Sequence, residues 1–177
     1  MANLKAIRIR ISSVKSTRQI TSAMKMVSAA KLRKAQDKIL RLKPYARKLQ
    51  EINAGLSQSL AEREIENIYS RNNSEEKILA VVITSNRGLC GAFNANVIRE
   101  ARRVVSEDYM EQFRKGNVTF LTIGKKGYDY LRKQKVNMLP ERNSLFNDLT
   151  FDNVSLVAEE VMKSFLAGVY DKVIIVY

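Results

Sequence analysis

The chain of 177 residues contains no histidine and no tryptophan, and it has only one cysteine and two prolines. Without histidine it lacks the side chain that proteins use most often as a general base and as a metal ligand. A single cysteine cannot form a disulfide within the chain, so the cysteine count gives no sign of an oxidising compartment. These absences weigh against a catalytic centre, a bound metal and a cofactor.

Long hydrophobic runs are also missing. No run approaches the roughly 18 apolar residues that span a bilayer, and the N-terminus has no signal-peptide core. Hydrophobic residues still make up 45% of the chain, which is enough for one globular domain but hardly for a second. We therefore expect a soluble chain that contacts a membrane only through partner proteins.

Helix-breaking residues are rare in residues 1–56, where no glycine precedes Gly55 and only Pro44 could impose a kink. Two series of apolar residues recur there at heptad spacing, which is typical of a long coiled-coil helix. Such a helix would run roughly 80 Å, against about 30 Å for a small domain, so it must project and needs a partner helix. The predicted apolar seam consists of Leu4, Ile7, Ile11, Val14, Leu32, Ile39, Leu42 and Leu49.

The middle of this seam is polar. Arg18, Lys25 and Ser28 stand where a dimerising coiled coil has leucine or isoleucine. Met24 and Val27 lie on a different face, a third of a turn or more away. The helix therefore changes what it contacts along its length, unless this stretch is simply solvated.

Charge is concentrated in the same helix. Of the 31 lysines and arginines, 14 lie between Lys5 and Lys48, and only Asp37 and Glu51 oppose them, so the helix carries about +12 of the net +13. A basic rod attached to a near-neutral body indicates an acidic partner, which can be nucleic acid, anionic lipid or an acidic protein surface.

A linker is predicted at residues 57–77, where Asn72-Asn73-Ser74 is the clearest loop signal, and an α/β domain follows at residues 78–177. Helices are expected over residues 94–113, 125–133 and 152–166, with Asn94 and Asp152 as caps of the first and last. Four apolar runs of strand length alternate with them, namely Ile78–Thr84, Val118–Ile123, Val136–Leu139 and Lys172–Tyr177.

This alternation of strands and helices predicts a small, Rossmann-like parallel sheet with helices on both sides. The chain stops on an apolar strand, which natural domains rarely leave as an exposed edge. We therefore expect the domain to be incomplete at its C-terminal edge.

The loop after the first strand, Ser85–Phe93, has the strand, loop and helix layout that binds phosphates. Its glycines do not form G-x-G-x-x-G, and no G-x-x-x-x-G-K-[ST] occurs in the chain. Cys90 at a helix N-terminus could serve as a nucleophile. A cysteine phosphatase loop, however, requires an arginine six positions further on, where this chain has Asn96. The loop is therefore interpreted as a packed structural loop without catalytic chemistry.

Three motifs together resemble the gamma subunit of the rotary F-type ATP synthase. They are LKAIRIRISSVKSTRQITSAMKMVSAAKLRKAQ at Leu4–Gln36, RLKPYA at Arg41–Ala46 and TSNRGLCGAFN at Thr84–Asn94. Asn86 replaces the usual aspartate of the family, and Ala92 replaces a common glycine. Family members continue into a last strand and a long C-terminal helix, which this sequence lacks.

The resemblance implies a central-stalk rotor without a catalytic site. In the family the N-terminal helix pairs with the C-terminal helix, and this shaft turns inside the ring of alpha and beta subunits while the α/β body lies by the epsilon subunit and the membrane c-ring. It also implies a peripheral position on the cytoplasmic face of the bacterial plasma membrane. The motifs assign Met24, Lys25 and Val27 to bearing contacts, and Arg87, Gly88, Leu89 and Cys90 to a loop that faces a neighbouring beta subunit.

Two other classes of protein are alternatives to the rotor hypothesis. A nucleic-acid-binding protein would use the basic helix, but it would also need aromatic or amide side chains between the basic residues, and the helix has only Tyr45, Gln19, Gln36 and Gln50. A small α/β enzyme would need a general base, a metal cluster or a phosphate loop, none of which the sequence provides. We expect no nucleic-acid partner.

Overall fold

The computed structural model describes residues 3–62, 68–69 and 75–177. The chain divides into two units, Met1–Ile65 and Glu66–Tyr177. The first unit contains one helix, and the second contains a sheet with its covering helices. The fold class is the predicted one, a long N-terminal helix followed by a small parallel α/β domain.

Helix α1 spans Leu4–Glu62, which is 59 residues and about 88 Å at 1.5 Å per residue. It continues through Pro44 and past Gly55, so the prediction that residues 57–62 begin a linker is wrong. An interior glycine costs a helix only about 1 kcal/mol, and the residues after it include leucine, alanine and glutamate, which favour helix. The predicted loop signal at residues 72–74 lies outside the described residues.

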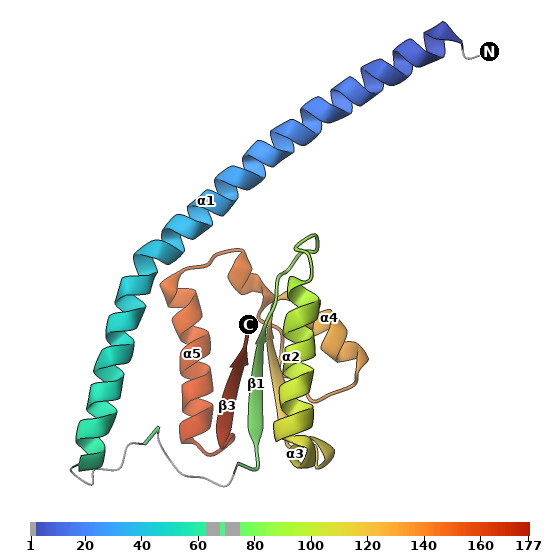
Figure 1. The fold of residues 1–177 in the computed structure, drawn as a ribbon. Coiled ribbons are helices and arrows are strands. Elements are labelled where there is room, and N and C mark those ends of the chain that lie inside the picture. The colour runs from blue at the N-terminus through green and yellow to red at the C-terminus, as the bar shows by residue number, and fades with distance from the viewer. Residues whose placement is uncertain (1–2, 63–67, 70–74) are drawn as a thin grey trace. The chain divides into compact units, whose positions relative to one another are not determined.

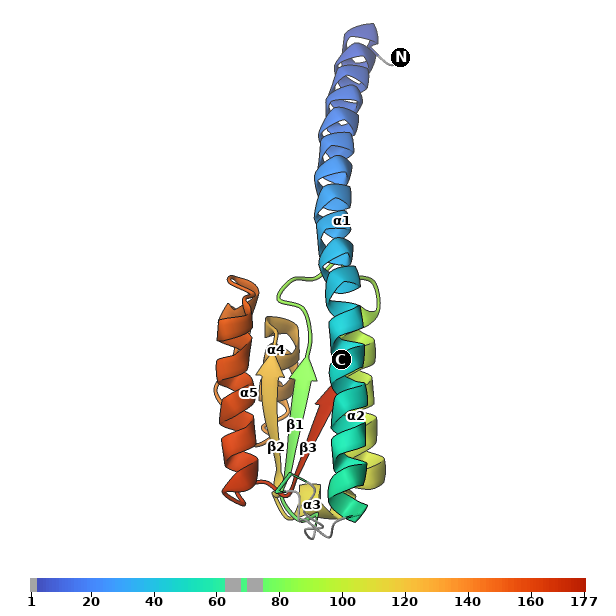
Figure 2. The same cartoon turned by 90° about the vertical axis from the view of Figure 1, so that its left-hand side faces the viewer.

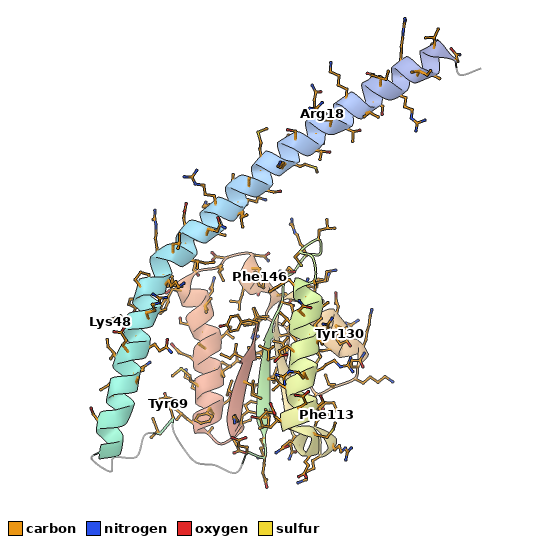
Figure 3. All side chains as sticks on the ribbon, viewed as in Figure 1. Arg18, Lys48, Tyr69, Phe113, Tyr130 and Phe146 are labelled. Atoms are coloured by element: carbon orange, nitrogen blue, oxygen red, sulfur yellow. The ribbon has the colours of Figure 1, made fainter. Side chains whose placement is uncertain are left out.

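The side chains of α1 are exposed along residues 3–56. Arg18 and Lys48, each 14 residues from one end of the helix, both extend from it (Figure 3). The apolar seam is exposed as well, from 43% at Leu49 to 73% at Leu4. An apolar stripe of this length in water marks a surface that another helix normally covers.

The sheet of the second unit has three parallel strands, and the arrows in Figure 2 point the same way. They are β1 (Ile78–Ile83), β2 (Val118–Ile123) and β3 (Lys172–Val176), in the order β2-β1-β3. Ile78 of β1 is in register with Val118 on one side and with Lys172 on the other. Within the described residues β3 pairs only with β1, so it forms one edge of the sheet.

Both faces of the sheet are covered by helices, as predicted (Figure 1). Ile78, Ala80 and Val82 pack with residues of α2 and α4, whereas Leu79 and Val81 pack with residues of α5. Alternate residues of a strand point to opposite faces, so a continuous apolar run suits a strand buried on both sides. The helical elements of this unit are α2 (Phe93–Asp108), α3 (Met110–Arg114), α4 (Lys125–Lys133), the short 3-10 helix η1 (Asn143–Phe146) and α5 (Phe151–Leu166).

The prediction of a fourth strand at Val136–Leu139 is wrong. This segment forms a single parallel bridge, Met138 with Phe120. The adjacent Pro140 has no N–H to continue a ladder, and Lys135 just before the segment has a φ of 55°. The segment is therefore too short between these two residues to become a strand.

Both predicted helix caps are wrong. Helix α5 begins two residues earlier, because Thr150 is its cap and accepts a hydrogen bond from the Asn153 N–H. Asp152 lies in the first turn, where its charge suits the helix dipole. Helix α2 has Ala92 at its cap position, and no side chain caps it.

Helix α2 also ends earlier than the predicted Phe113. Tyr109 leaves the helical region (φ −133°, ψ 31°) and separates α2 from α3. Its ring is buried in the core beside α2, with the Lys172 ammonium 5.5 Å from the ring centroid. Burying this ring against the sheet therefore outweighs the helical continuity that the sequence favours.

Candidate functional site

The loop between β1 and α2 is anchored at its start by Thr84. This residue follows β1 directly and is only 1% exposed. Its Oγ1 accepts a hydrogen bond from the Gly127 N–H at 2.8 Å and donates one to the Gly124 carbonyl at 3.2 Å. A Cβ at Gly124 would lie 2.1 Å from the Thr84 carbonyl oxygen, so only glycine fits there. The carboxyl ends of β1 and β2 are thereby locked together.

Asn94 holds the loop from its far end. Its Oδ1 accepts a hydrogen bond from the Ser85 N–H at 3.0 Å, and its Nδ2 lies 3.1 Å from Cys90 Sγ. Ser85 Oγ in turn donates to the Arg87 carbonyl at 2.5 Å. Asn94 was predicted to cap the following helix. Its side-chain amide instead contacts Ser85 and Cys90, so Asn94 closes the loop.

Asn86 joins the loop to two segments that are distant in sequence. Its Oδ1 accepts from the Lys125 N–H at 2.9 Å, and its Nδ2 donates to the Asn143 carbonyl at 3.0 Å. The Asn143 side chain accepts from the Gly124 N–H at 3.1 Å. An ionised aspartate at position 86 would keep the first bond but could not donate the second. The amide at this position therefore suits the contact that the structure shows.

The tip of the loop is displayed to solvent. Arg87, Gly88, Leu89 and Cys90 are all exposed, and the side chain of Leu89 is fully exposed. Leu89 also has a φ of 64°, a left-handed conformation that costs a non-glycine residue about 1–2 kcal/mol. A rigid base thus supports a tip in which an apolar and a cationic side chain are available for contact.

Among the residues that the structure describes, no group beside Cys90 could activate its thiol. The polar atoms near its sulfur are the Asn94 amide nitrogen at 3.1 Å and the Ser85 hydroxyl at 3.8 Å. Neither group takes up a proton in the physiological pH range, so neither can act as a general base. These contacts lie within the loop, and the side chain of Cys90 is otherwise exposed.

On α1, Met24, Lys25 and Val27 are exposed, at 65% for Met24 and 56% for Val27. Lys25 borders a shallow hollow on the helix surface that also includes Arg18 and Thr21. The Thr21 hydroxyl donates to the Thr17 carbonyl at 2.9 Å, so it stays close to its own helix. This part of α1 is therefore a smooth, cationic surface rather than a pocket.

The anchors of the loop, Thr84, Gly124 and Asn143, are structural residues of the candidate site that sequence reasoning missed. Gly124 falls between a predicted strand and a predicted helix, and Asn143 lies outside every predicted element. Asn86 and Asn143 are 57 residues apart, so no local periodicity connects them. A conserved pairing across homologues would be the only sequence signal for such a contact.

Comparison with known proteins identifies the chain. Residues 3–177 match a family model described as ATP synthase. The ATP synthase gamma chain of Chlorobaculum parvum is 45% identical over 177 residues, covering 100% of this chain and 60% of that protein. The gamma chain of Flavobacterium johnsoniae is 50% identical over 178 residues, with coverage of 100% and 59%. The chain thus spans about 60% of the length of the curated relatives that it matches.

The fold and the family match place this sequence among the subunits of ATP synthase. Its long helix exposes an apolar seam, which fits a subunit in which a further helix covers that seam. The chain belongs to the ATP synthase gamma chain family, as the three sequence motifs predicted. Within the described residues, no helix is both long enough and apolar enough to cross a bilayer.

Proposed function

We propose that the chain is the central-stalk rotor subunit of an F-type ATP synthase and has no catalytic site of its own. It couples ion flow through the membrane ring to ATP synthesis or hydrolysis on the alpha and beta subunits. The observation that carries this proposal is α1, a continuous 59-residue helix whose apolar seam is exposed. A second helix packed on this seam would form a two-stranded coiled coil, which suits a shaft.

The long helix and the α/β domain have different roles in this rotor. The shaft is the helix of residues 1–56 and its continuation to Glu62, and the domain of residues 78–177 forms the foot beside the epsilon subunit and the c-ring. Leu4, Ile7, Ile11, Val14, Leu32, Ile39, Leu42 and Leu49 pair with a C-terminal helix. The polar middle of the rod then meets the alpha and beta subunits.

Two groups of residues are proposed to face the alpha and beta subunits. Met24, Lys25 and Val27 are the bearing contacts of the shaft, and their exposure in α1 supports this role. The tip from Arg87 to Cys90 faces a neighbouring beta subunit, and the fully exposed Leu89 supports this role. The relatives are bacterial, which supports a peripheral place on the cytoplasmic face of the plasma membrane. The membrane is reached only through partner subunits.

Co-expression with the alpha and beta subunits of Chlorobaculum parvum tests the assignment. We expect the chain to copurify with these subunits when only the alpha subunit carries an affinity tag. The control is a variant with Leu32→Asp and Ile39→Asp, which disrupts the seam without touching Met24, Lys25 or Val27. Because the alpha and beta subunits are proposed to contact those three residues, this variant should still copurify.

The competing function is nucleic-acid binding through the basic helix. Any rod this basic binds DNA in a way that weakens steeply with salt and ignores sequence, so such binding is expected under either function. A clear preference for one duplex sequence at physiological salt, together with failure to copurify with alpha and beta, would overturn the rotor assignment.

A further inference from the structure

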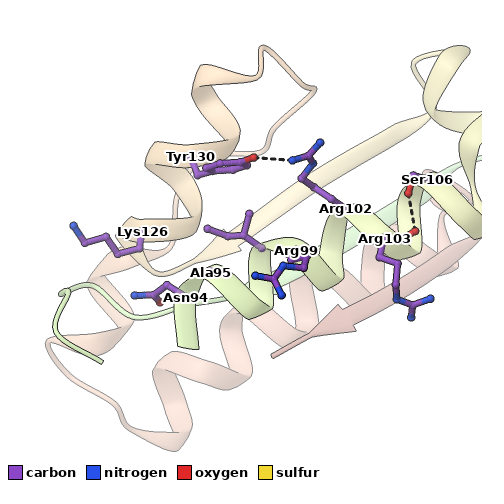
Figure 4. A pocket seen from close by; sticks show the side chains of 9 residues that line it. Asn94, Ala95, Arg99, Arg102, Arg103, Ser106, Lys126 and Tyr130 are labelled. Atoms are coloured by element: carbon purple, nitrogen blue, oxygen red, sulfur yellow. Dashed lines mark hydrogen bonds between the residues drawn. The ribbon is translucent and has the colours of Figure 1, made fainter. Parts of the chain in front are cut away.

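A groove of about 690 Å³ lies between α2 and α4 of the α/β domain, and it reaches the loop after β1 at Asn94. Arg99 and Arg102 of α2 line one wall, and Lys126 and Tyr130 of α4 line the other (Figure 4). Ile98 of α2 also lines the groove. Its volume falls within the range of about 300–1,000 Å³ that is typical of binding sites. Nothing in the proposed rotor function uses this groove.

The charges along the groove are only partly neutralised. Arg103 at its rim forms ion pairs with Glu100 at 2.6 Å and Glu107 at 2.5 Å, and the hydrogen bonds that its guanidinium donates to these carboxylates raise its pKa. Among the residues that the structure describes, neither Arg99, Arg102 nor Lys126 forms an ion pair with a carboxylate. The groove therefore carries three cations available to an anionic partner.

Arg102 is already held in place. Its Nη1 donates a hydrogen bond to the Tyr130 hydroxyl at 3.1 Å, across the groove (Figure 4). A guanidinium has five N–H donors, so most of them stay available for a carboxylate or phosphate. Fixing this side chain before binding lowers the entropy lost when the partner arrives.

The length of the groove indicates a polymer rather than a single ion. The lining residues of α2 run from Ala95 to Ser106, which corresponds to about 16 Å of helix. That distance matches about five residues of extended peptide and greatly exceeds one phosphate. Ala95 and Ile98 add apolar surface beside the cations, which a peptide's side chains can cover.

A single-stranded nucleic acid suits the groove less well. Such ligands normally stack several bases on aromatic side chains, and Tyr130 is the only aromatic residue among those lining the groove. Its hydroxyl is bound to Arg102, so the ring cannot turn freely. Acidic peptides need no stacking platform.

We propose that the groove between α2 and α4 docks an acidic segment of a partner protein. Carboxylates of that segment pair with Arg99, Arg102 and Lys126, and an apolar side chain packs on Ile98. This interaction does not depend on the rotor assignment, since the groove belongs to the α/β domain by itself.

The test uses the full chain and a fluorescent oligoglutamate peptide of about ten residues, enough to span the groove in extended form. The groove variant carries Arg99→Gln, Arg102→Gln and Lys126→Gln. The control variant carries Arg33→Gln, Lys34→Gln and Lys38→Gln on α1, and it loses the same charge. Circular dichroism checks that both variants keep the parent fold.

At physiological salt we expect the groove variant to bind the peptide about tenfold more weakly than the parent, from three lost charge pairs. The control variant should lose less than about twofold, because its three substituted side chains do not line the groove. Carbodiimide coupling followed by mass spectrometry should join peptide carboxylates to Lys126 in preference to Lys34.

Equal loss in the two variants would show that only net charge matters, and it would overturn the proposal. Coupling mainly to the lysines of α1 would do the same. Tighter, groove-dependent binding of single-stranded DNA of matched charge would identify a nucleic-acid site instead and would also refute the acidic-peptide proposal.

Discussion

Two buried threonines on neighbouring segments of the sheet behave differently at the residue scale. Thr84 is 1% exposed and its hydroxyl both donates and accepts a hydrogen bond. Thr122 on β2 is 0% exposed, yet its Oγ1 has no hydrogen-bond partner among the described residues. A buried hydroxyl stabilises a fold only when its hydrogen bonds are made. The two residues therefore offer a matched comparison.

Replacing each threonine by valine keeps its shape and removes its hydroxyl. We expect Thr84→Val to lower the free energy of unfolding by about 1–3 kcal/mol, because the Gly127 N–H loses its acceptor. Thr122→Val should leave this free energy unchanged or raise it by about 1 kcal/mol, because an unpaired hydroxyl no longer has to be buried. Urea denaturation of both variants provides the measurement. A larger loss for Thr122→Val than for Thr84→Val would contradict the hydrogen-bond assignment.

At the scale of elements, α1 shows how weakly local breakers act on a long helix. It passes through Pro44 and Gly55, each of which would disfavour a short helix. Among the described residues, no atom outside the neighbouring residues and nearby backbone of α1 lies within 4 Å of where a Cβ of Gly55 would be, so a larger residue fits there without a clash. The continuation to Glu62 thus depends on the helix-forming residues around Gly55.

A pair of reciprocal substitutions tests this account of the end of α1. Gly55→Ala should stabilise the helix by about 1 kcal/mol, and Ala54→Gly should destabilise it by about the same amount, since alanine and glycine differ by that much in a helix interior. Far-UV circular dichroism during heating reports the helical content of the chain. If both substitutions shift the melting curve in the same direction, something other than helix propensity governs this end of α1.

At the scale of the whole molecule, the two units differ in what completes them. The α/β unit has its own core on both faces of the sheet. The helical unit exposes its apolar seam, so its stability depends on a further helix that covers this seam. This difference is the physical basis for assigning the rod, rather than the domain, to the contacts of a shaft.

Substituting Lys25 in an assembled enzyme tests whether this residue is a bearing contact. Exposed ion pairs contribute only about 0–1 kcal/mol each, so acidic groups on the beta subunit can attract Lys25 without fixing one rotational position. Lys25→Glu should alter ATP turnover or its coupling while the complex still assembles. The matched control is Lys34→Glu, which changes the same charge nine residues along, on the opposite face of α1.

Cys90→Ala serves as a second control in the same assay. It should leave turnover nearly intact, because no general base of the described part of the chain lies beside the thiol. Unchanged turnover in Lys25→Glu would argue against a bearing contact at this position. A hundredfold loss in Cys90→Ala without loss of assembly would instead show that the loop has a chemical role.

Local patterns in the sequence determined the long helix, the strands β1, β2 and β3, helix α4 and the parallel α/β class. Each of these depends on apolar periodicity or on an uninterrupted apolar run, which a few neighbouring residues define. The bounds of Val118–Ile123 and Lys125–Lys133 could be predicted to the residue for this reason.

Only the tertiary structure decided that Val136–Leu139 is no strand, that Tyr109 ends α2 and that Asn94 closes the loop instead of capping a helix. It also decided that Asn86 meets Asn143, and that Arg102 and Tyr130 face each other across a groove. These outcomes depend on which distant groups compete for one side chain or one backbone N–H. That competition arises only after the sheet has formed, so it leaves no periodic pattern in the chain.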